Sequence, residues 1–209
     1  MVNNFHNYTP RIFDYDNLVD YTYLKQIFSK ANKDFLLKDY DLLESDVAET
    51  ALCGALKFRM EKFLDKDKIY DYYVDLEYNR NNGNIKTIID EELAIIKIKC
   101  DFILHSRGHN PKQDNLLALE MKKSYRSQEE KDTDRKRLIA LTKSTYDNDV
   151  WSYDGKTFPE HVCRYIIGIY YEIDWEKKKV ILEFYKGGQL AENKIIKLPL
   201  TPTKHFVRS

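Results

Sequence analysis

The sequence of 209 residues lacks the features that assign many chains to a class at once: many cysteines, an excess of one charge, and a long apolar run. Its three cysteines, Cys53, Cys100 and Cys163, lie far apart and form no CxxC or CxxH pair, which argues against a zinc site or a disulfide framework. No stretch approaches the roughly 20 apolar residues of a membrane span, and the first residues hold no apolar run of signal-peptide length. We therefore expect a cytoplasmic protein without a membrane partner.

The chain also has no excess of either charge, because its 34 basic and 34 acidic side chains give a net charge of zero. A protein that held nucleic acid mainly through its overall charge would be basic, so the balance counts against strong non-specific binding. It does not exclude a local basic face beside an acidic site. The hydrophobic fraction of 43% and the aromatic fraction of 13% are those of a folded chain rather than a disordered one.

The sequence does contain an alternation of helical and strand patterns. Apolar residues recur at helical spacing over roughly 45–64, where Ser45 is a suitable N-cap, and again over the charged stretch 127–145, where Leu138, Ile139, Leu141 and Thr142 face inward. Strand patterns are predicted in five other stretches: 69–79, 94–104, 116–123, 164–173 and 179–188.

The predicted order is helix, three strands, helix, strand, strand, with no internal repeat and no low-complexity linker. That order predicts one α/β domain over residues 1–209, with its core at about 44–190. We interpret residues 1–43 as an N-terminal extension wrapped on the core, helical around 28–40.

Three residues, Asp101, Glu120 and Lys122, form a candidate catalytic site. Glu120 and Lys122 share a strand face, because side chains on a strand alternate. The strand patterns that carry Asp101 and Glu120 are joined by about 11 residues, which suits antiparallel neighbours and places the two carboxylates side by side. Paired carboxylates repel unless a cation lies between them, and the backbone carbonyl of Met121 is a further oxygen ligand for Mg²⁺ or Mn²⁺. Such a set serves phosphodiester hydrolysis by a metal-activated water, with Lys122 positioning the water or offsetting charge.

The arrangement of Asp101 followed by Glu120-Met121-Lys122 resembles the PD-(D/E)XK, or restriction-endonuclease-like, nuclease superfamily. The segments VDLEYNR (74–80), CDFILHSRG (100–108) and NLLALEMKKS (115–124) look like a bacterial subgroup of its small members, and the resemblance covers about 44–175. Cys100 departs from the motif, which has proline before the aspartate.

The resemblance implies a three-layer α/β fold of restriction-endonuclease type, αβββαβ, with a mixed central sheet flanked by helices. It makes Asp101 and Glu120 metal ligands, Lys122 the catalytic lysine, and Glu49 the acidic residue of the first core helix. The expected activity is metal-dependent cleavage of nucleic acid, with DNA as the expected substrate, and a homodimer is left open.

Each candidate also has an ordinary structural interpretation. Glu120 and Lys122 would form a salt bridge at a solvated strand end, Asp101 would pair with Lys97 or Lys99, and Glu49 would be a surface residue. Four further candidates for substrate contact have structural alternatives as an ion pair, a turn or a satisfied histidine: Glu77, Arg80, His105 and Arg107. The basic run of the second helix would contact a nucleic-acid backbone or form a solvated face: Lys131, Arg135, Lys136 and Arg137.

Two other functions remain compatible with the sequence. One is a non-catalytic nucleic-acid- or protein-binding module on the same fold, and the other is an unrelated metal-dependent hydrolase of small phosphoesters. Fold alone does not separate these functions.

Overall fold

A computed structural model describes residues 19–77, 80–81, 84–85, 87–89, 95–97, 100–110, 113–143 and 164–198. A six-stranded mixed sheet forms the centre, with strand order β1-β6-β7-β8-β9-β10. Its strands are, in that order, Tyr73–Leu76, Phe102–His105, Asn115–Lys123, Ile167–Asp174, Lys179–Lys186 and Gln189–Lys197. All neighbours are antiparallel except β7 and β8, which are parallel.

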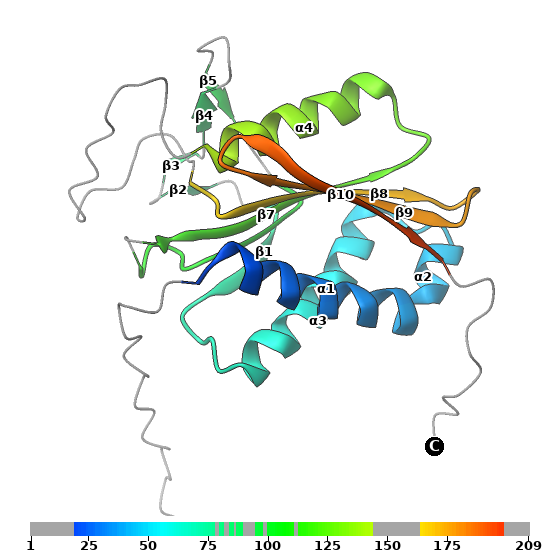
Figure 1. The fold of residues 1–209 in the computed structure, drawn as a ribbon, viewed down its shortest axis with the longest axis horizontal. Helices are drawn as coiled ribbons and strands as arrows, with labels where there is room; N and C mark the ends of the chain where they lie inside the picture. The colour runs from blue at the N-terminus through cyan, green and yellow to red at the C-terminus, as the bar shows by residue number, and fades with distance from the viewer. Residues whose placement is uncertain are drawn as a thin grey trace, which may run out of the picture.

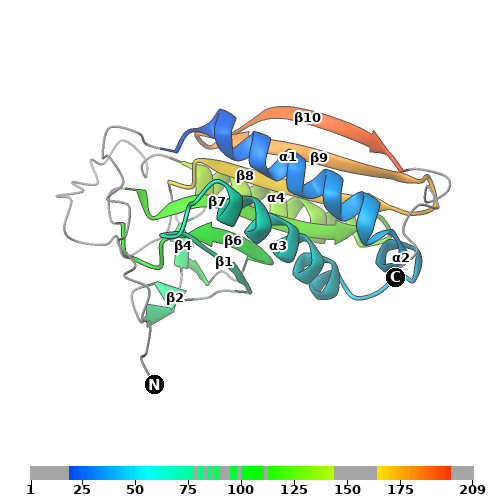
Figure 2. The ribbon, with the colours of Figure 1, turned by 90° about the horizontal axis from the view of Figure 1, so that it is seen from below.

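Helices cover both faces of this sheet, so the molecule has three layers (Figure 1). Helices α1 (Tyr21–Lys38) and α3 (Glu49–Lys66) lie against one face and α4 (Gln128–Thr142) against the other, as Figure 2 also shows. The short α2 (Tyr40–Glu44) connects α1 to α3. The described residues also form two small two-stranded sheets: β2 (Arg80–Asn81) with β3 (Asn84–Ile85), and β4 (Thr87–Ile89) with β5 (Ile95–Lys97).

The predicted mixed α/β architecture is confirmed, and the alternation of β7 explains its central place. Leu117, Leu119 and Met121 belong to the apolar core under α1 and α3, whereas Ala118 belongs to the core under α4. Both faces of this strand are therefore buried, as expected for a central strand with helices on both sides.

The first predicted helix begins later than the sequence suggested. Ser45 ends α2 instead of capping a long helix, and Asp46 follows with a φ of 51°. Such a left-handed residue breaks a helix, so the chain starts a new one at Glu49. This break places Glu49 in the first turn of α3.

The predicted strand over 94–104 is also interrupted. Residues 95–97 pair with β4 in a separate sheet, and only Phe102–His105 join the central sheet as β6. At the break, the side chain of Asp101 accepts a hydrogen bond from Met121 N (2.8 Å), and its carbonyl accepts one from Glu77 N (3.2 Å). Asp101 therefore joins the ends of β1 and β7 through its side chain and its carbonyl, at the point where β6 begins.

Helix α1 and the last strand belong to the packed molecule, while residues 1–18 of the predicted N-terminal extension lie outside the described residues. Seven residues of α1 are buried, among them Phe28 and Phe35, which contact Tyr171 of β8 edge to face. Strand β10, which the sequence did not predict, extends the sheet beyond β9. The core therefore begins before residue 44 and continues past residue 190. Among the described residues, none of the helices has both the length and the apolar character of a membrane span.

Candidate active site at the end of strand β7

The candidate site lies where β7 runs past the start of β6. Phe102 pairs with Leu119, and the side chain of Asp101, the residue before Phe102, accepts a hydrogen bond from the backbone N–H of Met121, the residue after Glu120. The predicted antiparallel pairing of the two segments is thus confirmed. Burial raises the pKa of Glu120 and the charge of Asp101 adds to the rise, so the two acids interact.

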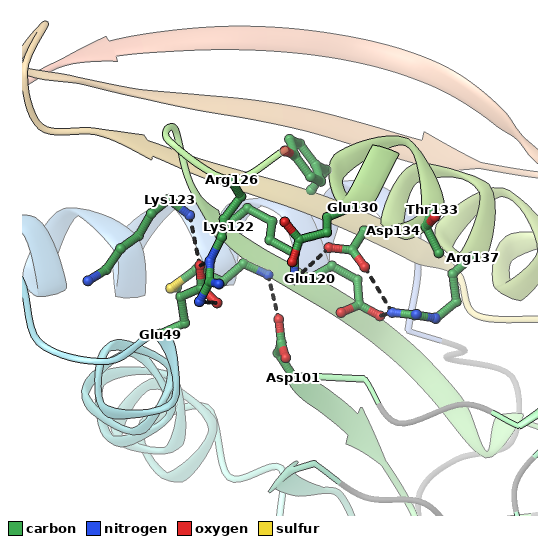
Figure 3. A network of polar contacts seen from close by, with 12 residues as sticks. Glu49, Asp101, Glu120, Lys122, Lys123, Arg126, Glu130, Thr133, Asp134 and Arg137 are labelled. Atoms are coloured by element: carbon green, nitrogen blue, oxygen red, sulfur yellow. Dashed lines mark hydrogen bonds and ion pairs between the residues drawn. The ribbon is translucent and has the colours of Figure 1, made fainter. Parts of the chain in front are cut away.

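Glu120 and Lys122 lie on the same face of β7, as their alternation predicted, and both reach side chains of α4. Glu120 is only 1% exposed and accepts a hydrogen bond from Arg137 Nη1 at 2.7 Å. Lys122 Nζ lies 2.9 Å from Asp134 Oδ2, and the other oxygen of Asp134 is 3.1 Å from Arg137 Nη1. Figure 3 shows Glu120 between Asp101 and these two side chains of α4.

Glu49 reaches the same end of β7 from α3. Its Oε1 accepts hydrogen bonds from Lys123 N (3.0 Å) and from Arg126 Nε (3.2 Å). Its charge also raises the pKa of Asp101. Glu49 is therefore part of the charged cluster at the end of β7, as Figure 3 shows.

Burial dominates the electrostatics of the site. It raises the pKa of Glu120 to about 8, with Arg137 opposing the rise. It also raises the pKa of Asp101, although the Met121 N–H group and Lys122 act in the other direction. For Lys122 burial lowers the pKa, but the hydrogen bond and charge of Asp134 more than offset this, so the ammonium is preserved.

Cys53 of α3 packs beneath the site, with its Sγ 3.8 Å from the sulfur of Met121. Burial raises the pKa of this thiol, and the charges of Asp101, Glu120 and Glu49 add to the rise. A thiol in such surroundings stays protonated and unreactive. Cys53 therefore contributes apolar packing to the floor of the site.

The other predicted substrate contacts fall into two places. Glu77 is exposed and adjoins Asp101 through its backbone, with a φ of 50°, while the side chain of Arg80 lies outside the described residues. His105 and Arg107 lie at or beyond the far end of β6, where both bind Asp75: His105 Nε2 at 3.0 Å and Arg107 Nη2 at 2.5 Å. The structure does not bring these two residues to Asp101.

Sequence reasoning missed Asp134 and misplaced most of the basic run on α4. Lys131, Arg135 and Arg137 were expected at the surface, but each pairs with a glutamate of the sheet, at Glu172, Glu183 and Glu120 respectively. Asp134 and Arg137 occur three residues apart, so they share one face of the helix. That spacing is the feature of the sequence from which Asp134 and Arg137 could have been grouped together.

The donor chemistry of the site suits a hard divalent cation. The carboxylates of Asp101 and Glu120 supply oxygen ligands, which Mg²⁺ and Mn²⁺ prefer. The N–H and C=O of one strand residue point to the same side, so the Met121 carbonyl faces the Asp101 edge as its N–H does. In the part of the chain that the structure describes, no three His, Cys, Asp or Glu side chains gather as a metal-binding group. The proposed set contains two carboxylates and a carbonyl, and one carboxylate is engaged with Arg137.

Comparisons of the chain with models of protein families, with curated proteins and with solved structures returned no match. The functional argument therefore rests on the residues of this chain.

Proposed function

We propose that the protein is a metal-dependent nuclease of restriction-endonuclease type, which hydrolyses phosphodiester bonds of nucleic acid, with DNA as the expected substrate. The observation that carries the proposal is the hydrogen bond from Met121 N to the Asp101 carboxylate, which brings Asp101 beside Glu120 on β7, while Glu120 and Lys122 both reach side chains of α4. The order α3, β1, β6, β7, α4, β8 supports it, since the resemblance implies the same succession. The antiparallel and parallel pairings form the expected mixed sheet.

In this proposal Asp101, Glu120 and the carbonyl of Met121 hold Mg²⁺ or Mn²⁺. The ion supplies polarisation of a phosphoryl oxygen and a lowered pKa for a bound water. Glu49 adds negative charge to the site and fixes the end of β7 through Lys123 N.

The protein's own contribution to catalysis is then mainly electrostatic. Lys122 keeps its charge because Asp134 lies 2.9 Å away, and its ammonium orients the attacking water or offsets charge that develops on the phosphoryl oxygens. Arg137 neutralises Glu120 when the carboxylate binds no cation.

Cleavage assays on purified protein test the proposal. Plasmid, single-stranded DNA, RNA and a small phosphodiester would be offered with Mg²⁺ or Mn²⁺. Asp101→Asn, Glu120→Gln and Lys122→Met should each reduce cleavage by roughly 100-fold or more. Two exposed residues provide matched controls, Glu129→Gln of α4 and Lys66→Met of α3, which should cleave like the unaltered protein. Undiminished turnover in the Asp101 and Glu120 variants would refute the assignment.

A non-catalytic binding module on the same fold is the second candidate. The ion pair between Glu120 and Arg137 favours it, because that contact satisfies the carboxylate without a metal. Such a module would bind its partner equally well with or without a divalent cation and would cleave nothing. A homodimeric state and a cytoplasmic location stay predictions of the sequence.

A further inference from the structure

Tyr125 is an exposed aromatic side chain on an ordered turn beside the candidate site. It is 67% exposed, whereas Tyr165, Tyr170 and Tyr171 are at most 1% exposed. The turn that carries it joins β7 to α4 and is fixed on both sides. Ser124 N donates to Ile173 O (2.8 Å), and Lys131 Nζ donates to Ser124 O (2.6 Å). The ring therefore projects from a fixed backbone, which lowers the entropy cost of binding a partner.

Two cationic side chains flank this ring. Lys123 Nζ and Arg126 Cζ each lie 5.8 Å from its centroid. Acidic residues hold both of them: Asp46 Oδ1 is 2.6 Å from Lys123 Nζ, and Glu49 Oε1 is 3.2 Å from Arg126 Nε. Sites for single-stranded nucleic acid combine these same parts, an aromatic face for a base and positive charge for the phosphates.

The turn is continuous with the proposed nuclease site. Tyr125 follows Lys122 by three residues, and Arg126 shares the carboxylate of Glu49 with the backbone of β7. If a nucleic-acid strand bound with one phosphate at Asp101 and Glu120, its next nucleotides would lie at this turn. The flat faces of bases inside a duplex are covered by their neighbours, so a tyrosine ring stacks only on a base that has left the stack.

We infer that Tyr125 is a stacking platform for an unpaired base and Arg126 a contact for the adjoining phosphate, so that the substrate is single-stranded nucleic acid. The inference rests on the proposed function and names its substrate class. Tyr73 provides a matched control, since it is also exposed (36%) and has the guanidinium of Arg107 4.3 Å from its ring. It pairs with His105 at the opposite end of β6 from Asp101.

Fluorescence anisotropy on the full chain in EDTA tests the inference without cleavage. The probes are oligodeoxythymidylate and oligouridylate of about 12 nucleotides, an abasic strand of equal length, and a blunt duplex. Tyr125→Leu should weaken binding of the oligonucleotides that carry bases by about 5- to 150-fold, and Tyr125→Phe and Tyr73→Leu should leave it unchanged. The unaltered protein should prefer the base-bearing strands to the abasic strand, and Tyr125→Leu should lose that preference. Urea unfolding of each variant verifies that it is folded.

Equal binding of the base-bearing strands by Tyr125→Leu and the unaltered protein would overturn the inference, as would no preference over the abasic strand or the duplex. The two proposals fail separately. Suppose that Tyr125→Leu loses the preference for base-bearing over abasic strands, but that the unaltered protein cleaves no substrate with any metal. This result would support the stacking platform at Tyr125 and refute the proposed nuclease. If instead the protein cleaves nucleic acid and Tyr125→Leu binds the oligonucleotides as tightly as the unaltered protein does, the nuclease is supported and the stacking platform is refuted.

Discussion

At the scale of single residues, the central feature is a carboxylate that is buried against a guanidinium. Glu120 is almost completely removed from water and accepts a hydrogen bond from Arg137. Burial lowers the pKa of Arg137, but the charge and hydrogen bond of Glu120 more than offset it. Removal of one member of such a pair costs far more than the pair contributes, because the other charge is left without compensation.

Arg137→Ala should therefore destabilise the protein strongly, by about 3–5 kcal/mol at pH 8.5. Lys136→Ala, on the exposed side of the same helix, should change stability by about 0.5 kcal/mol or less. Urea unfolding at equilibrium measures both values. If the two variants unfolded at the same urea concentration, the buried pair would not be the constraint that we describe.

The raised pKa of Glu120 makes stability depend on pH. The unfolded chain releases this proton near pH 4.5, whereas the folded protein holds it to about pH 8. Between these values the folded state binds the extra proton, so its stability falls as the pH rises. Glu120→Gln lacks the titration and should gain stability relative to the unaltered protein from pH 5 to pH 9, by at most about 5 kcal/mol. Unfolding free energies at several pH values measure the difference, and a constant difference would contradict the assignment.

At the scale of elements, α4 decides the form of the site. It is rich in charge, yet its inner face meets a glutamate on each of β7, β8 and β9, through Arg137, Lys131 and Arg135. Leu138 and Leu141 of the same helix are completely buried and supply its apolar contacts. The helix thus positions Asp134 and Arg137 against Glu120 and Lys122, so its first turns must be well anchored.

Ser127 anchors that first turn through a reciprocal capping box with Glu130. Its side chain accepts a hydrogen bond from Glu130 N (3.2 Å), and the Glu130 carboxylate accepts one from Ser127 N (3.1 Å). Ser127→Ala should cost about 1 kcal/mol of unfolding free energy, whereas Ser127→Asp should retain most of it. Thermal unfolding compares the two variants. Equal losses in both would mean that the cap contributes little.

At the scale of the whole molecule, α1 is part of the core rather than an addition to it. Phe28 is completely buried and contacts Tyr171 and Phe184 edge to face, so it joins the helix to β8 and β9. Phe28→Ala should cost about 3–5 kcal/mol through the cavity that it leaves. Affinity for a metal at the proposed site should persist below the lowered melting temperature, because the ring contacts of Phe28 are with Tyr171 and Phe184 and not with residues of that site. A loss of affinity in the folded variant would show that the two regions are coupled.

Much of this architecture was predictable from periodicity. Local patterns predicted β7, from a run that is apolar on both faces and charged at its end, and also the two strands after α4 and the turn between them. Strand β10 was not predicted from the sequence because its side chains are mostly exposed, so it has little apolar alternation. The break at Asp101 escaped because it depends on a long-range bond to Met121 N, which no local pattern contains.

The candidate site was predictable in part for the same reason. Strand alternation and a short connection were enough to place Asp101, Glu120 and Lys122 together. The role of Asp134 and Arg137 could not be read from α4, since a helix with charges on several faces does not reveal which one is buried. His105 ends β6, the strand that begins directly after Asp101, so the four residues of this strand separate the two by about 13 Å.

Calorimetric titration with Mn²⁺ tests the central claim most directly, because it asks whether Asp101 and Glu120 together hold a divalent cation. We predict that the unaltered protein binds Mn²⁺ and that Asp101→Asn weakens the affinity by at least about 10-fold, while the exposed control Glu129→Gln binds normally. Absence of binding by the unaltered protein, or equal affinity in Asp101→Asn, would contradict the account.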